Sequence, residues 1–466
     1  MTLAKKKVTK SQAVSAKQKP PVKHKMAWRI WIGLTLVVTT LMTLEILSES
    51  PEDFSPGGLT SAHHQIELAC SACHTSEFGG LETIDQACQD CHNTQLNAQK
   101  DSHPAKKFTD PRNADRLEDI NALSCVACHA EHHEDRDQGM AVTVANDFCI
   151  KCHAEVDEER PTHKDFDTMT CATAGCHNYH DNTALYEDFL MKHLDEPNVL
   201  ATAKVASKNS HEWLPKLEKR SETALFDGRT VDPMITHDWS ETAHAQSNVG
   251  CQDCHAAKTA DNPEGKWLDN LGTEVCASCH AQESEGFLEG KHGMREQLGL
   301  SAMTPAQARL AMNPMSHDKT LSCMSCHSSH RFDVQKAAVE GCLNCHSDEH
   351  SKNYLQSRHY KLWLDEKSND ALTGTGVSCA TCHMPRLIVE AHESQSGQME
   401  VRVEHNQSLN LRPNEKMVRT VCLSCHGLQF TLDALADEVL ILNNFSGQPS
   451  EQVQSLEWAK KASGGS

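Results

Sequence analysis

The sequence predicts a mainly α-helical protein with extensive irregular loops and one N-terminal transmembrane helix. Three observations lead to this fold class. The 22 Cys of the 466 residues occur in close pairs, aromatic residues make up only 5% of the chain, and a long apolar stretch follows a basic N-terminus. No sustained alternation of apolar and polar residues marks a β-strand. An ordinary aromatic-rich core is therefore not expected.

The Cys pairs share one pattern, and each is followed directly by His. Ten pairs read C-x-x-C-H: Cys70/Cys73/His74, Cys88/Cys91/His92, Cys125/Cys128/His129, Cys149/Cys152/His153, Cys251/Cys254/His255, Cys276/Cys279/His280, Cys323/Cys326/His327, Cys342/Cys345/His346, Cys379/Cys382/His383 and Cys422/Cys425/His426. The eleventh pair is stretched, with four residues between Cys171 and Cys176 before His177. No Cys is left over.

This pattern is the attachment signature of c-type haem. The two Cys capture the two vinyl groups of a haem as thioethers, and the adjacent His is carried beneath the ring as the proximal iron ligand. Zinc sites and disulfides also use Cys pairs, but neither requires His after the second Cys. His is only 30 of 466 residues and fills that position at all pairs. We therefore expect 11 covalently attached haem c groups.

Eleven haems leave few residues to surround each of them. We expect short helices and loops packed around the haems, which themselves form the core, with folding coupled to haem attachment. The fold class is thus a multihaem cytochrome c, mainly α with irregular loops. The expected organisation is a cytoplasmic basic tail (1–26), a transmembrane anchor (27–47), a five-haem domain (48–204), a linker (205–236) and a six-haem domain (237–466). One continuous haem array with an insertion is the alternative.

The N-terminus indicates a membrane anchor. Residues 1–25 contain eight Lys and no acidic residue, and the stretch from Ala27 to Leu47 is apolar. As a helix this stretch is about 31 Å long at ~1.5 Å per residue, which matches a hydrocarbon core of ~30 Å. The basic flank places the tail in the cytoplasm. A cleaved signal peptide is the competing interpretation, but no clear A-x-A site follows.

The remaining chain is acidic. The formal net charge is −20, and residues 1–29 contribute only positive charge. Such a surface argues against nucleic acid as a partner. We expect a single-pass protein of the inner (cytoplasmic) membrane with its haem domains in the periplasm.

Two helices are indicated near the C-terminus, one over 431–442 and one over 450–461. Ser450 is a candidate N-cap of the second helix, and Gly464 and Gly465 follow its end.

His is abundant enough to supply a second axial ligand to every haem. Beyond the 11 proximal His and the cytoplasmic His24, 18 candidates remain: His63, His64, His103, His132, His133, His163, His180, His193, His211, His237, His244, His292, His317, His330, His350, His359, His392 and His405. Haems with two His ligands pass electrons and bind no substrate. Met ligation would raise the potential, but the surplus of His makes it unnecessary.

The six-haem half resembles a known superfamily. The run from Cys323 through His327 to His330-Arg-Phe, the run from Cys342 through His346 to Glu349-His350, and Tyr354-x-x-Ser357-x-His359 are similar to hydroxylamine oxidoreductase. The segment ending in His383-Met384-Pro385 resembles the ammonia-forming nitrite reductases. The similarity to the hydroxylamine oxidoreductase, octahaem cytochrome and nitrite reductase superfamily covers roughly 237–430. The five-haem half, with Cys128-His-Ala-Glu-His132, looks like class III-type multihaem cytochromes.

The first resemblance implies one open haem that acts on a small nitrogen or sulfur compound. Carried over to this sequence, the open haem is at Cys323/Cys326/His327, with Glu349 and His350 as an acid–His pair beside it. An alignment on Met384-Pro385 places it at Cys276/Cys279/His280 instead. All 11 sites end in His, and no Tyr follows Tyr360, whereas the superfamily's enzymes often use a proximal Lys or a later crosslinking Tyr.

These observations favour an electron carrier over an enzyme. The expected function is electron transfer along a chain of mostly bis-His haems, with a multihaem oxidoreductase as the alternative. The expected partners are the inner membrane and other redox proteins: a quinone-linked donor or acceptor and periplasmic or outer-membrane cytochromes. A small nitrogen or sulfur substrate belongs to the enzyme alternative.

Overall fold

The structure is a computed structural model of the chain. It describes residues 25–47, 55–76, 79–99, 103–112, 117, 120–133, 142–145, 147–160, 163, 179–180, 187–202, 230–390, 399–410 and 416–462. The chain divides into two compact units, Met1–Ser55 and Pro56–Ser466. The expected division of the haem region at residues 205–236 stays a prediction.

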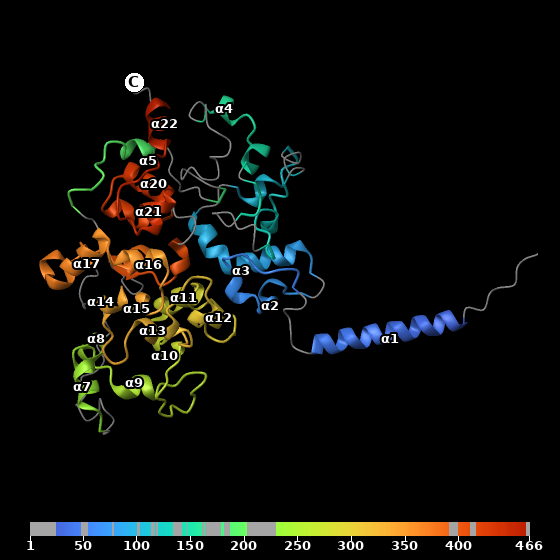
Figure 1. The fold of residues 1–466 in the computed structure, drawn as a ribbon, viewed down its shortest axis with the longest axis horizontal. Helices are drawn as coiled ribbons and strands as arrows, with labels where there is room; N and C mark the ends of the chain where they lie inside the picture. Colours follow the sequence, from blue (N-terminus) through green and yellow to red (C-terminus); the bar gives the residue numbers. More distant parts are fainter. Residues whose placement is uncertain are drawn as a thin grey trace, which may run out of the picture. The chain divides into compact units, whose positions relative to one another are not determined.

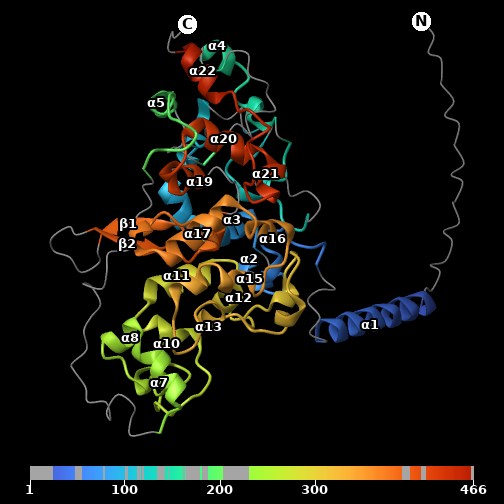
Figure 2. The same cartoon turned by 60° about the vertical axis from the view of Figure 1, so that its left-hand side comes forward.

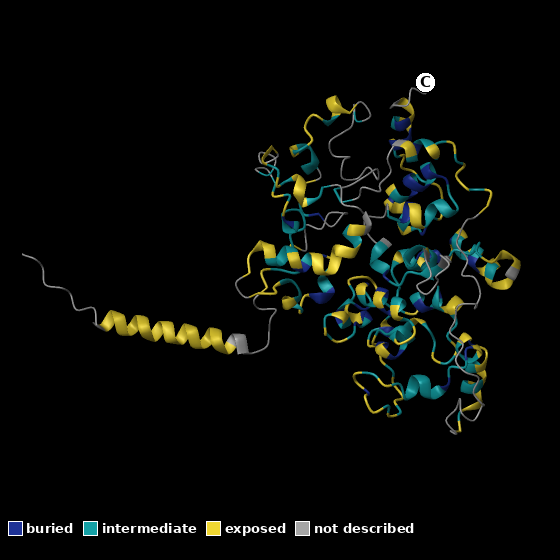
Figure 3. Ribbon diagram, turned by 180° about the vertical axis from the view of Figure 1, so that it is seen from behind, coloured by how far each residue is buried: buried dark blue, intermediate teal, exposed yellow. Residues whose placement is uncertain are grey.

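The first unit contains one helix, α1 (Lys25–Leu47). Residues Met26–Leu44 of this helix are long and apolar enough to cross a membrane, and no part of that stretch is buried against protein. Figure 3 shows the described side chains of α1, residues 26–44, as exposed. The helix covers the predicted anchor, Ala27–Leu47, with two further residues at its start.

The second unit is built from short helices joined by long loops, which Figure 1 traces. Its α-helices are α2 (Cys70–Cys73), α3 (Leu81–Gln99), α4 (Val156–Glu159), α5 (Glu187–Lys192), α7 (Pro233–Ser240), α8 (Ala243–Gln246), α9 (Cys251–His255), α10 (Thr273–Ala277), α11 (Ala281–Glu289), α12 (Met294–Gln297), α13 (Cys323–Cys326), α14 (Val334–Ala337), α15 (Glu340–Leu343), α16 (Glu349–Tyr354), α17 (Arg358–Ser368), α18 (Cys379–His383), α19 (Lys416–Thr420), α20 (Leu428–Ala436), α21 (Glu438–Leu442) and α22 (Ser455–Ala462). Short 3-10 turns cover His64–Ile66, Ala105–Lys107, Cys125–Ala127, Phe148–Lys151, Pro305–Gln307, Pro314–Ser316, Asp370–Leu372, Gln407–Asn410 and Cys422–Ser424. The predicted mainly α fold with irregular loops is confirmed.

A pair of strands was not expected from the sequence. Strand β1 (Arg386–Glu390) pairs antiparallel with β2 (Met399–Val403), with Arg386 opposite Val403, and Figure 2 shows the two as neighbouring arrows. Each strand has only five residues: β2 (MEVRV) alternates between apolar and charged residues but is too short to be a sustained pattern, and β1 (RLIVE) does not alternate. Pairing between two such segments is a tertiary effect that periodicity within one segment cannot reveal.

The two predicted C-terminal helices differ from the structure in their bounds. The helix expected over 431–442 is two helices, α20 and α21, separated at Asp437, whose carboxylate accepts a hydrogen bond from the N–H of Leu440 and caps α21. The helix expected over 450–461 begins only at Ser455. Ser450 is not its N-cap, because its N–H and hydroxyl both donate to Asp437. A long-range contact has replaced the local cap.

The apolar core of the second unit is small and divided. One cluster joins α5, α19, α20 and α22 through Leu190, Val418, Leu428, Leu432, Leu456 and Ala459. Another contains Val339, Tyr354 and Trp363. Both clusters are too small to organise the whole unit, so most of its elements must be held by something other than apolar side-chain packing.

Candidate haem-binding sites

Each described C-x-x-C-H motif is helical: the Cys88/Cys91/His92 motif lies inside α3, and the others form short helical turns. In seven of them the His N–H donates to the carbonyl of the first Cys, four residues earlier, at 2.8 to 3.0 Å, as for His74, His129, His153, His280, His327, His346 and His426. Residues three and four apart lie on the same face of a helix. The turn therefore presents both Cys and the His to the same side, which is the geometry that thioether attachment and iron ligation together require.

The second Cys of three motifs lies just past the end of its turn. These motifs form 3-10 turns, and the residues concerned are Cys128, Cys152 and Cys425. At Cys152, for example, the turn Phe148–Lys151 contains Cys149 and ends one residue before Cys152. The N–H of Cys152 still donates to the Cys149 carbonyl, at 3.2 Å. This bond keeps Cys152 beside Cys149, and His153 follows directly in the chain.

Every described proximal His faces a second His ring. Ring centroids lie 5.9 to 6.5 Å apart in ten pairs: His74–His132, His92–His63, His129–His180, His153–His103, His255–His330, His280–His244, His327–His405, His346–His292, His383–His350 and His426–His359. All ten second members are among the candidates that the sequence suggested as distal ligands.

This separation is too large for ring stacking and fits a metal ion held between two imidazoles. A metal–imidazole bond is about 2 Å long, so two rings on opposite sides of one ion have centroids about 6 Å apart. Among the described residues, no group of three or more His, Cys, Asp or Glu is placed to hold a metal ion by itself. The facing pair is the repeated unit, and it fits the two axial ligands of a haem iron.

The other candidate residues divide into two groups. Six described His are outside the ten pairs: His64, His133, His163, His193, His237 and His317. The stretched motif Cys171/Cys176/His177, together with His211 and His392, lies outside the described residues.

Both expected positions of an open haem have a second His. His327 faces His405 at 6.5 Å, and His280 faces His244 at 6.0 Å. The expected acid–His pair does not form beside His327, because His350 faces His383 and Glu349 is exposed at the start of α16. The structure thus places a second His at the two sites where the superfamily resemblance implied catalysis.

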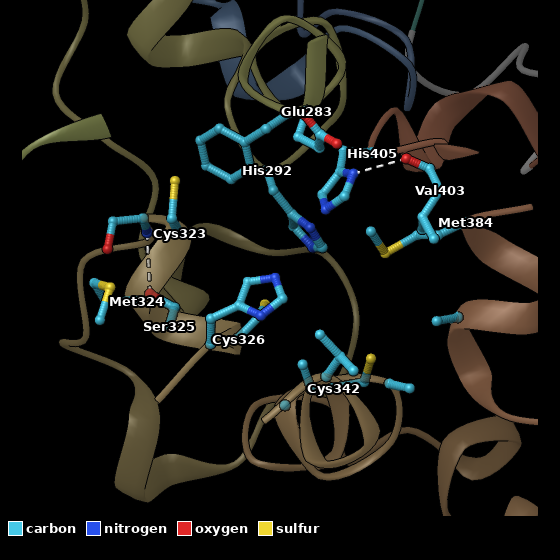
Figure 4. Close-up of a pocket in the computed structure, with 18 of the residues that line it drawn as sticks. Glu283, His292, Cys323, Met324, Ser325, Cys326, Cys342, Met384, Val403 and His405 are labelled. Carbon is cyan, nitrogen blue, oxygen red and sulfur yellow. Dashed lines mark hydrogen bonds between the residues drawn. The ribbon is translucent and has the colours of Figure 1, made fainter. Parts of the chain in front are cut away.

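The β-hairpin positions one of these ligands. His405 follows β2 closely, and its Nδ1 lies 2.9 Å from the carbonyl of Val403. This contact leaves Nε2 to point toward the turn that carries Cys323 and Cys326, as Figure 4 shows. Gly286 in α11 permits the approach, since a Cβ there would meet the backbone of His405 at 3.3 Å.

Burial keeps several paired imidazoles neutral. It lowers the pKa of His292 to about 4, with a smaller contribution from nearby His346 and His383. Burial likewise lowers the pKa of His359 and of His383 to about 4. A neutral imidazole has a free lone pair, which is the form that binds a metal.

A connected cavity of about 4100 Å³ runs along the C-terminal pairs. Five Cys pairs of the second half line it, from Cys251/Cys254 to Cys379/Cys382. Folded proteins leave few voids larger than a water molecule, so a cavity of this size is built for large bound groups. His64 also lines it, and its buried Nε2 has no hydrogen-bond partner among the described residues. A polar group such as a haem propionate fits this position.

The described Cys of the first half do not line this cavity. Cys152 is one example. Cys152 is half-buried and does not line the cavity, whereas Cys345, its counterpart in the fourth motif of the second half, does. Lys151 and Phe148, from the same turn, line a separate, smaller cavity that Cys152 does not reach. The expected attachment of haem at Cys152 stays a prediction. It rests on the spacing of the motif and on the facing rings of His153 and His103.

Several motifs lie next to one another. The thiols of Cys88 and Cys125 are in hydrogen-bond contact, and so are those of Cys276 and Cys323. A third contact of the same kind joins Cys342 to Cys379. These contacts connect the first Cys of consecutive motifs, so groups attached there are immediate neighbours.

The paired sites repeat along the chain. His63 stands seven residues before Cys70 and pairs with His92 of the second motif; His244 stands seven residues before Cys251 and pairs likewise with His280. A second correspondence involves His132 and His330. Each lies three residues after a proximal His, has a positive φ (62° and 63°), and pairs with the His of the first motif in its half.

The remaining pairs follow the same order in both halves. His103 and His292, each between the second and third motifs of its half, pair with the fourth, His153 and His346. His180 and His405, each after the fifth motif, pair with the third, His129 and His327. The sequence analysis did not recognise this duplication, although the His-x6-Cys and C-x-x-C-H-x-x-H spacings would have indicated it.

The two halves are joined at the second motif. Among the paired His of the first half, only His63 and His92 line the large cavity. The turn that carries His63 is bound by cations of the second half: Lys291 Nζ donates to the Ser61 carbonyl at 3.0 Å, and Arg295 Nη1 donates to the Gln65 carbonyl at 2.6 Å. Lys291 directly precedes His292, so one contact links segments that carry paired His of both halves.

The comparison with protein families agrees with this duplication. Two regions, residues 62–154 and 243–347, match the family described as Cytochrome c3. Each region begins one residue before the first paired His of its half and ends one residue after the His of the fourth motif. No solved structure matches the chain.

The fold, the Cys pairs and the family match fit one class of protein, a multihaem c-type cytochrome. The match implies covalently bound haem c and points to electron transfer. The expected resemblance of residues 237–430 to the hydroxylamine oxidoreductase superfamily is not tested by this match and stays a prediction.

Proposed function

We propose that this chain is a membrane-anchored periplasmic cytochrome with 11 haems that carries electrons without itself acting on a small substrate. The observation that carries the proposal is the set of ten facing His pairs. An iron with His on both sides has no position left for a substrate. Bound haem supplies a reversible one-electron couple at each site.

The side chains have three tasks in this proposal. The Cys of each turn fix the position of the attached group, and the two His of each pair fill both axial positions. At six sites a backbone carbonyl accepts from Nδ1 of one ring, as Val403 does from His405, and holds that ring in one tautomer and one orientation. This fixed coordination keeps the reorganisation on electron transfer small.

The contacts between motifs support a connected array. Neighbouring Cys of successive motifs touch, and the cavity that holds the C-terminal pairs also reaches His63 and His92. Electrons therefore pass between the two repeated groups of sites at the second motif.

The proposed location and partners follow from α1 and from charge. A basic tail followed by a helix of membrane-spanning length supports an inner-membrane anchor with the haem sites on the periplasmic side. A quinone-linked partner in the membrane and periplasmic or outer-membrane cytochromes are the proposed donors and acceptors. The net charge of −20 favours a basic docking surface on the partner.

Carbon monoxide tests the proposal, because it binds ferrous haem only where an axial position is open. The purified, detergent-solubilised protein is reduced with dithionite and exposed to carbon monoxide while its visible spectrum is recorded. The expected result is an unchanged spectrum and no turnover of nitrite or hydroxylamine. A spectral change that accounts for one haem in 11, together with turnover of either compound, would contradict the proposal and favour an enzyme.

A further inference from the structure

One paired His is bonded to a carboxylate. His63 Nδ1 lies 2.7 Å from Glu131 Oε1. Glu131 also accepts from Thr60, through the backbone N–H at 3.0 Å and the hydroxyl at 3.0 Å. Three hydrogen bonds thus fix this carboxylate behind the ring, whose Nε2 remains available on the side that faces His92.

At six other sites the hydrogen-bond partner of a paired His is a backbone carbonyl, not a carboxylate. There one ring of the pair has its Nδ1 within hydrogen-bond distance of a backbone carbonyl, as for His103, His132, His255, His350, His405 and His426. Two further paired rings approach a carboxylate without bonding to it. His280 Nδ1 lies 3.9 Å from Glu283 Oε2, and His346 Nδ1 lies 3.8 Å from Asp348 Oδ2.

The duplication provides an internal comparison. Glu131 lies between the proximal His129 and the distal His132, and Ser329 occupies the same position between His327 and His330. The counterpart of His63 is His244, whose ring packs against Phe332 at 4.5 Å. The carboxylate is therefore a feature of one repeat that the shared layout of sites does not require.

A hydrogen bond from a ligating His to a carboxylate makes the imidazole more basic. A more basic ligand donates more electron density to the iron and stabilises the ferric form relative to the ferrous form. Second-sphere hydrogen bonding of this kind is one of the means by which a protein sets a haem potential. A carbonyl, which bears no net charge, has a weaker effect.

We propose that Glu131 is a positioning residue that lowers the reduction potential of the haem held by His63 and His92, relative to the six sites whose ring donates to a backbone carbonyl. This inference rests on the proposed function, because it takes His63 as an iron ligand. It places a low-potential site at the motif where the two repeated groups of sites meet.

The substitution Glu131→Gln tests this inference. Gln removes the charge and keeps one oxygen, which accepts from His63 and from the Thr60 hydroxyl, so the ring orientation is retained; only the bond from the Thr60 N–H to the second oxygen is lost. Potentiometric titration of the intact protein, followed by the low-spin ferric EPR signals, is expected to show one component moving to higher potential while the others stay in place. The control is Asp348→Asn. The Asp348 carboxylate does not bond to the ring of His346, so a much smaller shift in potential is expected.

A second variant acts in the opposite direction. Thr60→Val removes one donor from Glu131 and leaves more of its charge to polarise His63, so the same component is expected to move slightly lower. Unchanged titration curves for Glu131→Gln, a uniform shift of all components, or an upward shift for Thr60→Val would overturn the inference. Failure of the proposed function is distinguished by the wild type, which would then show a high-spin signal.

Discussion

Each distal ligand is a single side chain whose removal has a definite spectroscopic consequence. His405 is held by its own short segment after β2 and faces His327 across 6.5 Å. Its position depends on the hairpin and on Gly286 rather than on the motif it serves. The ring could therefore be lost without disturbing the attachment of the haem at Cys323 and Cys326.

We expect His405→Ala to convert one low-spin site into a five-coordinate, high-spin site. The signal should correspond to about one haem in 11 and should appear together with carbon monoxide binding, which we do not expect of the wild type. EPR and visible spectroscopy of the purified variant measure both effects. His237→Ala is the matched control, because its side chain is 71% exposed and it belongs to none of the ten pairs. A low-spin His405→Ala protein would mean that another residue holds that position.

The orientation of the two rings also varies between pairs. The rings of His255–His330 are inclined by 21°, whereas those of His244–His280 are inclined by 87°. The nearly parallel pairs are those of the first and third motifs in both halves, with inclinations of 21° to 33°. At these two motifs the duplication thus preserves ring orientation as well as the choice of partner.

Local and long-range elements differ in how far the sequence predicts them. The C-x-x-C-H turn is local, so the proximal His could be assigned from spacing alone. The distal His are contributed by elements far away in sequence, such as the segment after β2 for His327, and the sequence identified them only as candidates. The broken helix at Asp437 and the late start of α22 have the same cause, since a tertiary contact between Asp437 and Ser450 competes with local capping.

The repeated layout leads to a prediction for the fifth motif, whose residues lie outside the described part of the chain. In the second half His383 of the fifth motif, Cys379/Cys382/His383, faces His350, which follows the fourth motif. His163 follows the fourth motif of the first half. We therefore expect His163→Ala to generate one high-spin haem, as measured by EPR against total haem.

The control for this prediction is His193→Ala. His193 lies later in the chain and is bonded through Nδ1 to Glu196 at 2.7 Å. The duplicated order of ligands gives it no haem in the first half. A high-spin signal in the His193 variant and none in the His163 variant would show that the two halves are not equivalent at the fifth site.

The whole molecule depends on its cofactors for a core. The two apolar clusters are small, and a cavity of about 4100 Å³ separates elements that would otherwise pack directly. The low aromatic content led us to expect haems in place of large apolar side chains, and the small clusters and the cavity fit that expectation. The contacts of Lys291 and Arg295 with the turn that carries His63 could not be predicted, because each joins residues 230 positions apart.

The central claim is that every iron in this molecule has two His ligands, which makes the chain an electron carrier. Quantitative EPR of the oxidised, detergent-solubilised protein against total haem tests it most directly. The account predicts low-spin ferric signals only, with no change on addition of nitrite or hydroxylamine. A high-spin ferric signal close to one haem in 11 that responds to either compound would contradict it and would indicate an open, substrate-binding site.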